Sequence, residues 1–282
     1  FNMKLAKLAH EKGIPVVSYI APSAWAWHKS RAKNVAKIVD KVASIFPFEY
    51  DVYKEAGANV EFVGHPLVDI VKPKMTEAEA NTFAGQQDDR KLILIMPGSR
   101  LMEIEKMLPT LLEAAKLIKK QLPEVDFVMP RAGSIPLQML EEKIKASGIS
   151  VKITEGNNYD LFSVADLALA TSGTVTLEAA LCGLGSVIVY RTNPLTYFIA
   201  KLVVNIPHIG LPNIVAGKSV LPELIQDDFT PEKVAKEAMS LLERERNAKM
   251  KEDLAYVKER LGKPGAVGRV AELVLEIAGE KK

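Results

Sequence analysis

The chain has 282 residues and a mass of 30.9 kDa, which suggests roughly two domains at about 150 residues per domain. Its 48% hydrophobic and 26% charged residues exclude a disordered chain, and the near balance of 37 basic and 35 acidic residues excludes an overall basic field, so we expect no nucleic-acid partner. The single cysteine excludes a disulfide framework and a multi-cysteine zinc site, and it is typical of a reducing compartment, so we expect a cytoplasmic protein.

Strand-like runs alternate with helical patterns from the first residues. Apolar side chains share one helical face before Gly13, and Ile14–Ile20 then indicates a buried strand. The next expected elements are a basic helix at 28–40, strands at 42–46 and 60–63, and a short helix at 49–56. Because the chain opens in the middle of this alternation, we expect a fragment of a longer protein, with a native start after removal of the initiator Met as the alternative.

A polar stretch, Met75–Arg90, is interpreted as a domain boundary or linker, and a second series of alternating elements follows it. The expected strands lie at 92–96, 125–129, 151–153, 167–170 and 186–190, with helices between them, and the tail at 231–278 is almost entirely helical. Strands that alternate with helices predict an α/β fold with doubly wound parallel sheets. The expected domains are 1–88, 89–230, and a group of C-terminal helices at 231–282 that can return to the first domain.

The turn Pro97-Gly98-Ser99-Arg100 directly follows the apolar strand at 92–96. Gly98 allows a ligand to approach the backbone, the following helix start offers unpaired N–H groups to an anion, and Arg100 can contact a phosphate through two nitrogens. Ligands of open α/β sheets bind beyond the carboxyl ends of the strands. The turn therefore predicts a phosphate or nucleotide site, with an ordinary βα turn and a solvated arginine as the alternative.

A second loop, Ser172-Gly173-Thr174, places another helix start at the same sheet edge. Glu178 lies four residues after Thr174, whereas a capping box needs an acid three residues after the cap, so capping from Thr174 does not explain it. Glu178 is thus a candidate to accept hydrogen bonds from ribose hydroxyls. Compensation of the helix dipole is the alternative.

Two further residues are candidates for this edge. Arg191 ends the strand at 186–190, and Asn213 lies in a loop with few charges around it. An asparagine in a loop more often forms a turn than binds a ligand. The candidates at this edge are more persuasive together than any one of them is alone.

Two apolar segments are candidates for contact with lipid. Trp25 and Trp27 precede a basic helix, a combination typical of a membrane interface, with buried tryptophans and solvated lysines as the alternative. The run 194–204, which contains Phe198, predicts contact with acyl chains or a bilayer, but a buried crossing helix or a subunit interface is favoured over it. No apolar run reaches the ~20 residues of a membrane-spanning helix.

The histidines indicate no metal site. His65 lies in the turn Gly64-His65-Pro66, where a structural role is favoured over a role in orienting a substrate. The other histidines lack mutual ligand spacing, so we expect no metal.

Taken in order, the chain contains the following motifs: Phe1-Asn2, Ala21-Pro22-Ser23-Ala24-Trp25-Ala26-Trp27, Phe46-Pro47-Phe48-Glu49, Gly64-His65-Pro66, Pro97-Gly98-Ser99-Arg100, Ser172-Gly173-Thr174 with Glu178, Tyr190-Arg191, and Leu211-Pro212-Asn213 with Ala216-Gly217. The ordered set resembles the lipid-A-disaccharide synthase family from residue 1 to about residue 270. The single motifs are common, but their order is specific.

The resemblance implies a GT-B fold, in which two Rossmann-like domains face each other, with the first domain incomplete at its N-terminal side. It implies an inverting, metal-independent glycosyltransferase of lipid A and lipopolysaccharide synthesis that needs no cofactor. This enzyme joins UDP-2,3-diacylglucosamine to 2,3-diacylglucosamine 1-phosphate through a β-1,6 linkage and releases UDP. The resemblance also implies a peripheral protein at the inner-membrane surface that can form a homodimer.

The resemblance also implies site residues. The donor UDP-sugar is expected to contact Gly98, Ser99, Arg100, Ser172, Gly173, Thr174, Glu178, Arg191 and Asn213. Because the implied substrates carry acyl chains, the candidates that the sequence itself offers for contact with the acceptor or its lipid are Trp25, Trp27, His65 and Phe198.

The chain departs from the family at its start. The family's glycine-rich start and its proposed catalytic Asp lie upstream of Phe1, so the catalytic base in this chain is unknown, and we expect this polypeptide alone to be inactive. Another UDP-sugar enzyme of the same fold, such as an epimerase or a peptidoglycan glycosyltransferase, and a UDP-binding module without catalysis are the alternatives. A dinucleotide-dependent oxidoreductase is disfavoured because no Gly-x-Gly-x-x-Gly follows a strand.

Overall fold

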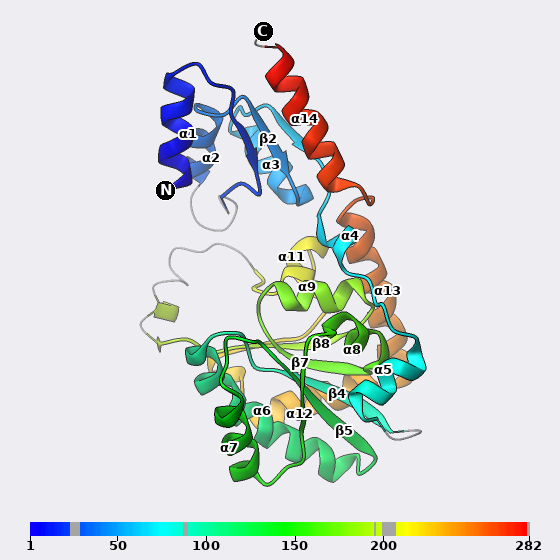
Figure 1. Cartoon of the computed structure of the whole chain (residues 1–282). Coiled ribbons are helices and arrows are strands. Elements are labelled where there is room, and N and C mark those ends of the chain that lie inside the picture. Colours follow the sequence, from blue (N-terminus) through cyan, green and yellow to red (C-terminus); the bar gives the residue numbers. More distant parts are fainter. Residues whose placement is uncertain (23–28, 87–89, 195, 199–206, 281–282) are drawn as a thin grey trace. The chain divides into compact units, whose positions relative to one another are not determined.

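The computed structural model describes residues 1–22, 29–86, 90–194, 196–198 and 207–280. These residues form two compact units, each with its own parallel sheet (Figure 1). Unit 1 contains the described residues up to Ile70 together with the chain from Lys258 onward, and unit 2 contains the described residues between Val71 and Val257. The parallel strands and intervening helices confirm the predicted α/β class.

Unit 1 has a three-stranded parallel sheet in the order β1-β2-β3. Its elements are α1 (Asn2–Glu11), β1 (Val17–Tyr19), α2 (Lys29–Ala36), β2 (Lys41–Ser44), α3 (Pro47–Glu55), β3 (Val60–Phe62), α4 (Leu67–Ile70) and α14 (Ala266–Glu280). Val35, Val42 and Tyr53 form the centre of its core, where each is at most 1% exposed. Helix α14 packs on β1 and β2, so the C-terminal end of the chain completes this unit.

Unit 2 has a six-stranded parallel sheet in the order β6-β5-β4-β7-β8-β9. Its strands are β4 (Lys91–Met96), β5 (Val125–Arg131), β6 (Lys152–Glu155), β7 (Leu167–Thr171), β8 (Ser186–Tyr190) and β9 (Glu223–Ile225). The remaining elements are α5 (Glu77–Ala84), α6 (Leu101–Gln121), α7 (Leu137–Ser147), α8 (Asn158–Val164), α9 (Thr174–Leu181), α11 (Leu211–Ala216), a short 3-10 turn (Gln226–Asp228) and α12 (Pro231–Leu242). Helix α13 (Arg244–Arg260) begins in unit 2 and ends in unit 1.

Strand β4 shows why the apolar runs of unit 2 lack alternation. Ile93 and Ile95 pack with helices α6 and α12 on one face, whereas Leu92 and Leu94 pack with residues of α8 and α9 on the other. All four side chains are fully buried. A strand covered on both faces has no polar face, as expected for a parallel sheet between helix layers.

The unit boundaries differ from the expected domains 1–88, 89–230 and 231–282. The stretch interpreted as a linker contains helix α5, which begins with a capping box in which Thr76 and Glu79 bond each other's backbone N–H groups. Asp160 of α8 accepts hydrogen bonds from the N–H groups of Lys74 and Met75, and α5 packs on α8. Unit 2 therefore begins near residue 71 and also includes α12, which packs against α6.

Candidate functional site

The strand order of unit 2 reverses between β4 and β7. The chain proceeds from β4 outward to β5 and β6, and then returns to the other side of β4 for β7, β8 and β9. At such a switch point the loops after the two central strands diverge to opposite faces of the sheet, and they leave a crevice at the carboxyl edge. The turn after β4 and the loop after β7 are the two loops that the sequence predicted to hold a phosphate or nucleotide.

These two loops line a cavity of about 500 Å³, which we call the switch-point cavity. Of the nine residues expected at the donor, the cavity brings together Gly98, Ser99, Arg100, Ser172, Gly173, Thr174 and Glu178. It is completed by residues that the sequence analysis did not select: Met96, Glu103, Pro130, Ala132, Asn158, Thr171 and Val175. The starts of helices α6 and α9 both lie in its wall, so their partial positive charges favour an anionic ligand.

Glu103 shapes the first loop. Its Oε2 accepts hydrogen bonds from the N–H groups of Ser99 and Arg100 at 2.9 and 3.2 Å, and its Oε1 pairs with Arg100 Nη1 at 2.6 Å. Gly98 has a φ of +117°, and a Cβ there would lie 2.5 Å from Glu103 Oε2. The expectation of unpaired N–H groups is therefore corrected for Ser99 and Arg100, because the chain's own carboxylate already binds them.

The second loop is held by Ser172. Its Oγ donates to the carbonyl oxygen of Ile209 at 2.9 Å, and its N–H donates to Val189 O at 3.0 Å. Helix α9 then begins after Gly173, and no side chain among the described residues caps its first N–H groups. Thr171, the last residue of β7, is 3% exposed, and its hydroxyl has no hydrogen-bond partner among the described residues.

Glu178 projects from the first turns of α9 into the wall of the cavity. Burial raises the pKa of the Glu178 carboxyl, and hydrogen bonds with Tyr159 and Thr174 partly offset that rise. The hydrogen bonds with Tyr159 and Thr174, and not a capping box, orient the Glu178 carboxyl. A partly buried, oriented carboxylate in a nucleotide-sized cavity can accept hydrogen bonds from sugar hydroxyls.

Two expected donor residues do not line the cavity. Arg191 donates to the carbonyl oxygens of Gln226 and Phe229, and its guanidinium lies 4.9 Å from the centre of the Phe229 ring. Asn213 lies in helix α11 and not in a loop, is fully buried, and bonds Leu221 O at 2.8 Å and Glu223 Oε1 at 2.6 Å. Both side chains are therefore engaged in holding the chain that follows β8.

The expected acceptor or lipid residues have different surroundings. His65 is buried, accepts a hydrogen bond from Leu67 N–H at 3.1 Å and contacts the Phe46 ring, and burial lowers its pKa to about 4. This environment is that of a neutral structural histidine in a turn. Phe198 is 62% exposed, whereas Trp25 and Trp27 lie outside the described residues.

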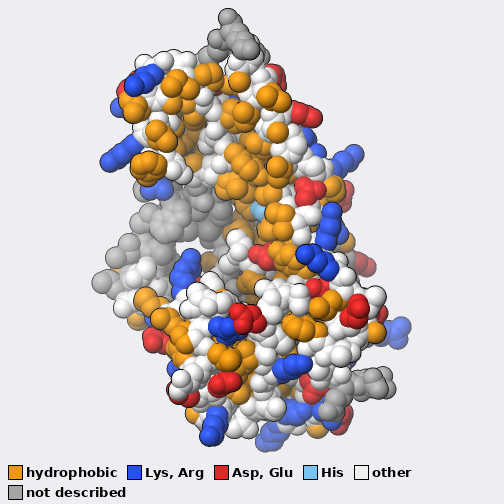
Figure 2. Space-filling model, in the orientation of Figure 1, with side chains coloured by type: hydrophobic (Ala, Val, Ile, Leu, Met, Phe, Trp, Pro, Cys, Tyr) orange, Lys and Arg blue, Asp and Glu red, His pale blue; other side chains and the backbone are white. Residues whose placement is uncertain are grey.

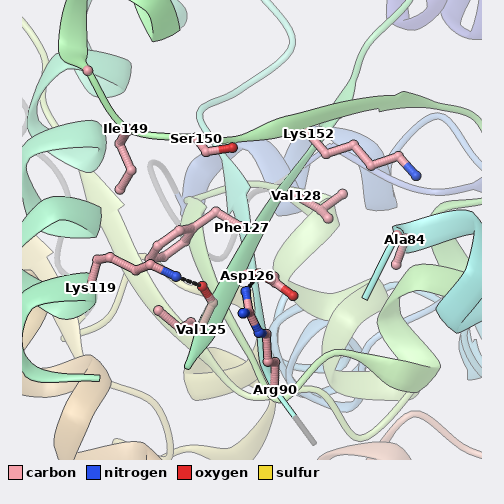
Figure 3. A pocket seen from close by; sticks show the side chains of 12 residues that line it. Ala84, Arg90, Lys119, Val125, Asp126, Phe127, Val128, Ile149, Ser150 and Lys152 are labelled. Carbon is pink, nitrogen blue, oxygen red and sulfur yellow. Dashed lines mark hydrogen bonds and ion pairs between the residues drawn. The ribbon is translucent and has the colours of Figure 1, made fainter. Parts of the chain in front are cut away.

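A second cavity of about 480 Å³ lies at the opposite, amino edge of the same sheet (Figure 3). Arg90 pairs with Asp126 at 3.2 Å and with Glu124 at 3.1 Å, and Lys119 Nζ donates to Val125 O at 2.6 Å. Lys152 Nζ likewise donates to Phe83 O. These cations are bound to the starts of the strands and to α5, so the carboxyl-edge cavity is the candidate site.

Comparison with known proteins defines the class first. The fold is α/β with parallel sheets and is GT-B-like: the UDP-GlcNAc 2-epimerase of Neisseria meningitidis, solved with UDP-GlcNAc, matches 97% of this chain and 73% of its own at a TM-score of 0.65 and 16% identity. An Anabaena protein solved with UDP and glucose matches 96% of this chain and 74% of its own at a TM-score of 0.54 and 14% identity. These likenesses show the fold.

Sequence comparison then defines the family. The model of the lipid-A-disaccharide synthetase family matches residues 1–275. The lipid-A-disaccharide synthase of Geobacter metallireducens is 43% identical over all of this chain and 74% of its own length, and that of Nitrosococcus oceani is 41% identical over 98% and 71%. The chain belongs to the lipid-A-disaccharide synthase family, whose members are glycosyltransferases of lipid A biosynthesis. Among the described helices, none is both long and apolar enough to cross a membrane.

Proposed function

We propose that the switch-point cavity binds the UDP part of UDP-2,3-diacylglucosamine, the donor whose sugar the family transfers to 2,3-diacylglucosamine 1-phosphate. The observation that carries this proposal is the convergence of two helix starts, Arg100 and the oriented carboxyl of Glu178 on one cavity at the topological switch point. On this proposal the diphosphate lies at the starts of helices α6 and α9, which favour an anion, and Glu178 accepts hydrogen bonds from the ribose hydroxyls.

The chemistry of the transfer follows from this placement. The 6-hydroxyl oxygen of the acceptor attacks the anomeric carbon of the donor while a general base takes the hydroxyl proton, the bond to the diphosphate breaks, and UDP leaves with the bonding electrons. Negative charge therefore builds on the diphosphate as the transition state forms. Arg100 and the helix starts line the same cavity, and they lower the barrier by stabilising that charge.

Calorimetry with UDP tests the proposal. We expect the chain to bind UDP, and Arg100→Ala to bind it about tenfold more weakly, because a charge-assisted hydrogen bond is worth about 1.5–3 kcal/mol. Arg246→Ala is the matched control, since Arg246 pairs with Glu237 on helix α12 and does not line the cavity. Absence of UDP binding by the unsubstituted chain contradicts the proposal.

We also propose that the protein works at the inner-membrane surface, because both proposed substrates carry acyl chains. Hydrophobic side chains gather on the visible surface of unit 1 (Figure 2). Phe1, Leu5 and Leu8 recur at helical spacing along α1 and are 95%, 54% and 49% exposed. Lys4 and Lys7 lie on the same helix, so α1 has the composition of an interfacial amphipathic helix.

A further inference from the structure

Three buried hydroxyls lack a hydrogen-bond partner among the described residues, those of Thr154, Thr171 and Ser186, and of these residues only Thr171 lines the switch-point cavity. It is the last residue of β7, it lines the switch-point cavity, and it is 3% exposed. Its Oγ1 has no hydrogen-bond partner in the described part of the chain. Because buried hydroxyls are nearly always paired, and an unpaired one lowers stability, this hydroxyl calls for a partner that the described residues do not supply.

Neighbouring hydroxyls in the same wall are already engaged. Ser172 Oγ donates to Ile209 O at 2.9 Å, and Thr174 is hydrogen-bonded to Glu178. Ser172 is thereby tied to the chain at Ile209 and Thr174 to Glu178 of its own helix α9, whereas the Thr171 hydroxyl has no such bond among the described residues. Thr171 ends a central strand and lines a cavity whose wall contains the starts of α6 and α9.

We infer that Thr171 is a further binding residue of the site, and that its Oγ1–H donates a hydrogen bond to a phosphate oxygen of the nucleoside diphosphate. This inference rests on the proposed function, because it takes UDP as the ligand of the cavity. A phosphate oxygen is the partner because the helix starts and Arg100 direct the anionic part of the ligand to this part of the wall. The hydroxyl is left unpaired in the free chain and gains its bond when the ligand enters.

The isosteric variant Thr171→Val gives effects of opposite sign on binding and stability. It removes the hydroxyl and keeps the branched shape, so we expect UDP to bind about tenfold more weakly, as for loss of one hydrogen bond to a charged group. The midpoint of thermal unfolding should be no lower than that of the parent chain, because an unpaired buried hydroxyl is replaced by a methyl group. Thr171→Ser keeps the hydroxyl and should bind UDP within about twofold of the parent.

Thr154→Val is the matched control. Thr154 of β6 is also buried, at 7% exposed, and its Oγ1 is also without a partner among the described residues, but it does not line the cavity. Its replacement should leave the affinity for UDP unchanged. At saturating UDP, the ³¹P resonances of the bound nucleotide should differ from those of the parent complex in Thr171→Val and should match them in Thr154→Val.

The outcomes separate this inference from the proposed function. Failure of the parent chain to bind UDP contradicts the proposed function itself. Binding of UDP by the parent together with equal affinity in Thr171→Val, or with unchanged ³¹P resonances in that variant, overturns the role of Thr171 alone. A drop in the unfolding midpoint of Thr171→Val also overturns it, because that result shows a hydroxyl that is already paired in the free chain.

Discussion

Arg100 is available to a ligand even though it is already paired. Its side chain is 79% exposed and bonds Glu103 at 2.6 Å. An ion pair this exposed contributes at most about 1 kcal/mol, so a diphosphate can recruit the guanidinium at little cost. Glu103 meanwhile keeps the turn in shape through the N–H groups of Ser99 and Arg100.

The buried His65 makes stability depend on pH. Its pKa is about 4 in the folded chain against 6.5 for the free side chain, so the unfolded state binds the proton more readily. The free energy of unfolding should therefore fall as the pH decreases from about 6.5 to about 4. His65→Asn retains an acceptor for Leu67 N–H and should weaken this dependence, as measured by urea unfolding at pH 7 and pH 5.

The exposed His10 on helix α1 supplies the control for this measurement. His10→Asn should keep the pH dependence of the parent chain. A loss of stability between pH 7 and pH 5 that is as large in His65→Asn as in the parent contradicts the assignment of the dependence to His65.

At the scale of elements, the start of α5 offers a direct test of the revised boundary. Thr76 caps this helix by accepting from Glu79 N–H, and Glu79 accepts from Thr76 N–H at 2.8 Å. Thr76→Ala should lower the free energy of unfolding by about 1 kcal/mol, as for loss of an N-cap. Thr82→Ala on the same helix, where the hydroxyl only bonds Ala78 O, should cost less, and equal costs contradict a capping role.

The strands and most helices could be predicted because long apolar runs and turn residues mark them locally. Helix α5 was missed because its residues are mostly polar, although Thr76-x-x-Glu79 is a capping box visible in the sequence. Strand β9 was missed because its apolar run is only Leu224-Ile225, between the polar Glu223 and Gln226. The sequence favours a loop at Asn213, whereas the residue lies in helix α11, which begins at Leu211 with Pro212 in its first turn.

The candidate site could be predicted only in part. Parallel strands end at one edge, so the loops after β4 and β7 were expected together, but Arg191 at that edge is turned to Phe229. Glu103 and Thr171 could not be predicted from the sequence. Glu103 matters through its hydrogen bonds to the N–H groups of Ser99 and Arg100, and Thr171 through a buried hydroxyl without a partner among the described residues. Only the spacing from Arg100 to Glu103 could have drawn attention to the first of them.

At the scale of the whole molecule, the exposed apolar side chains of α1 should promote binding to membranes. We expect the chain to float with vesicles that contain anionic lipid, and the double variant Leu5→Gln and Leu8→Gln to float less, because it removes apolar area from the interface. Leu137→Gln, which changes an exposed leucine on α7 of unit 2, is the control. Equal recovery of the double variant and the parent contradicts a role for α1 at the membrane.

The central claim is that the switch-point cavity of unit 2 holds the UDP part of a sugar donor. A crystal structure of the chain with UDP tests this most directly. We predict the diphosphate at the starts of helices α6 and α9, beside Arg100, with the ribose hydroxyls within hydrogen-bond distance of Glu178. Ordered UDP bound elsewhere on the chain, with this cavity empty, would contradict the account.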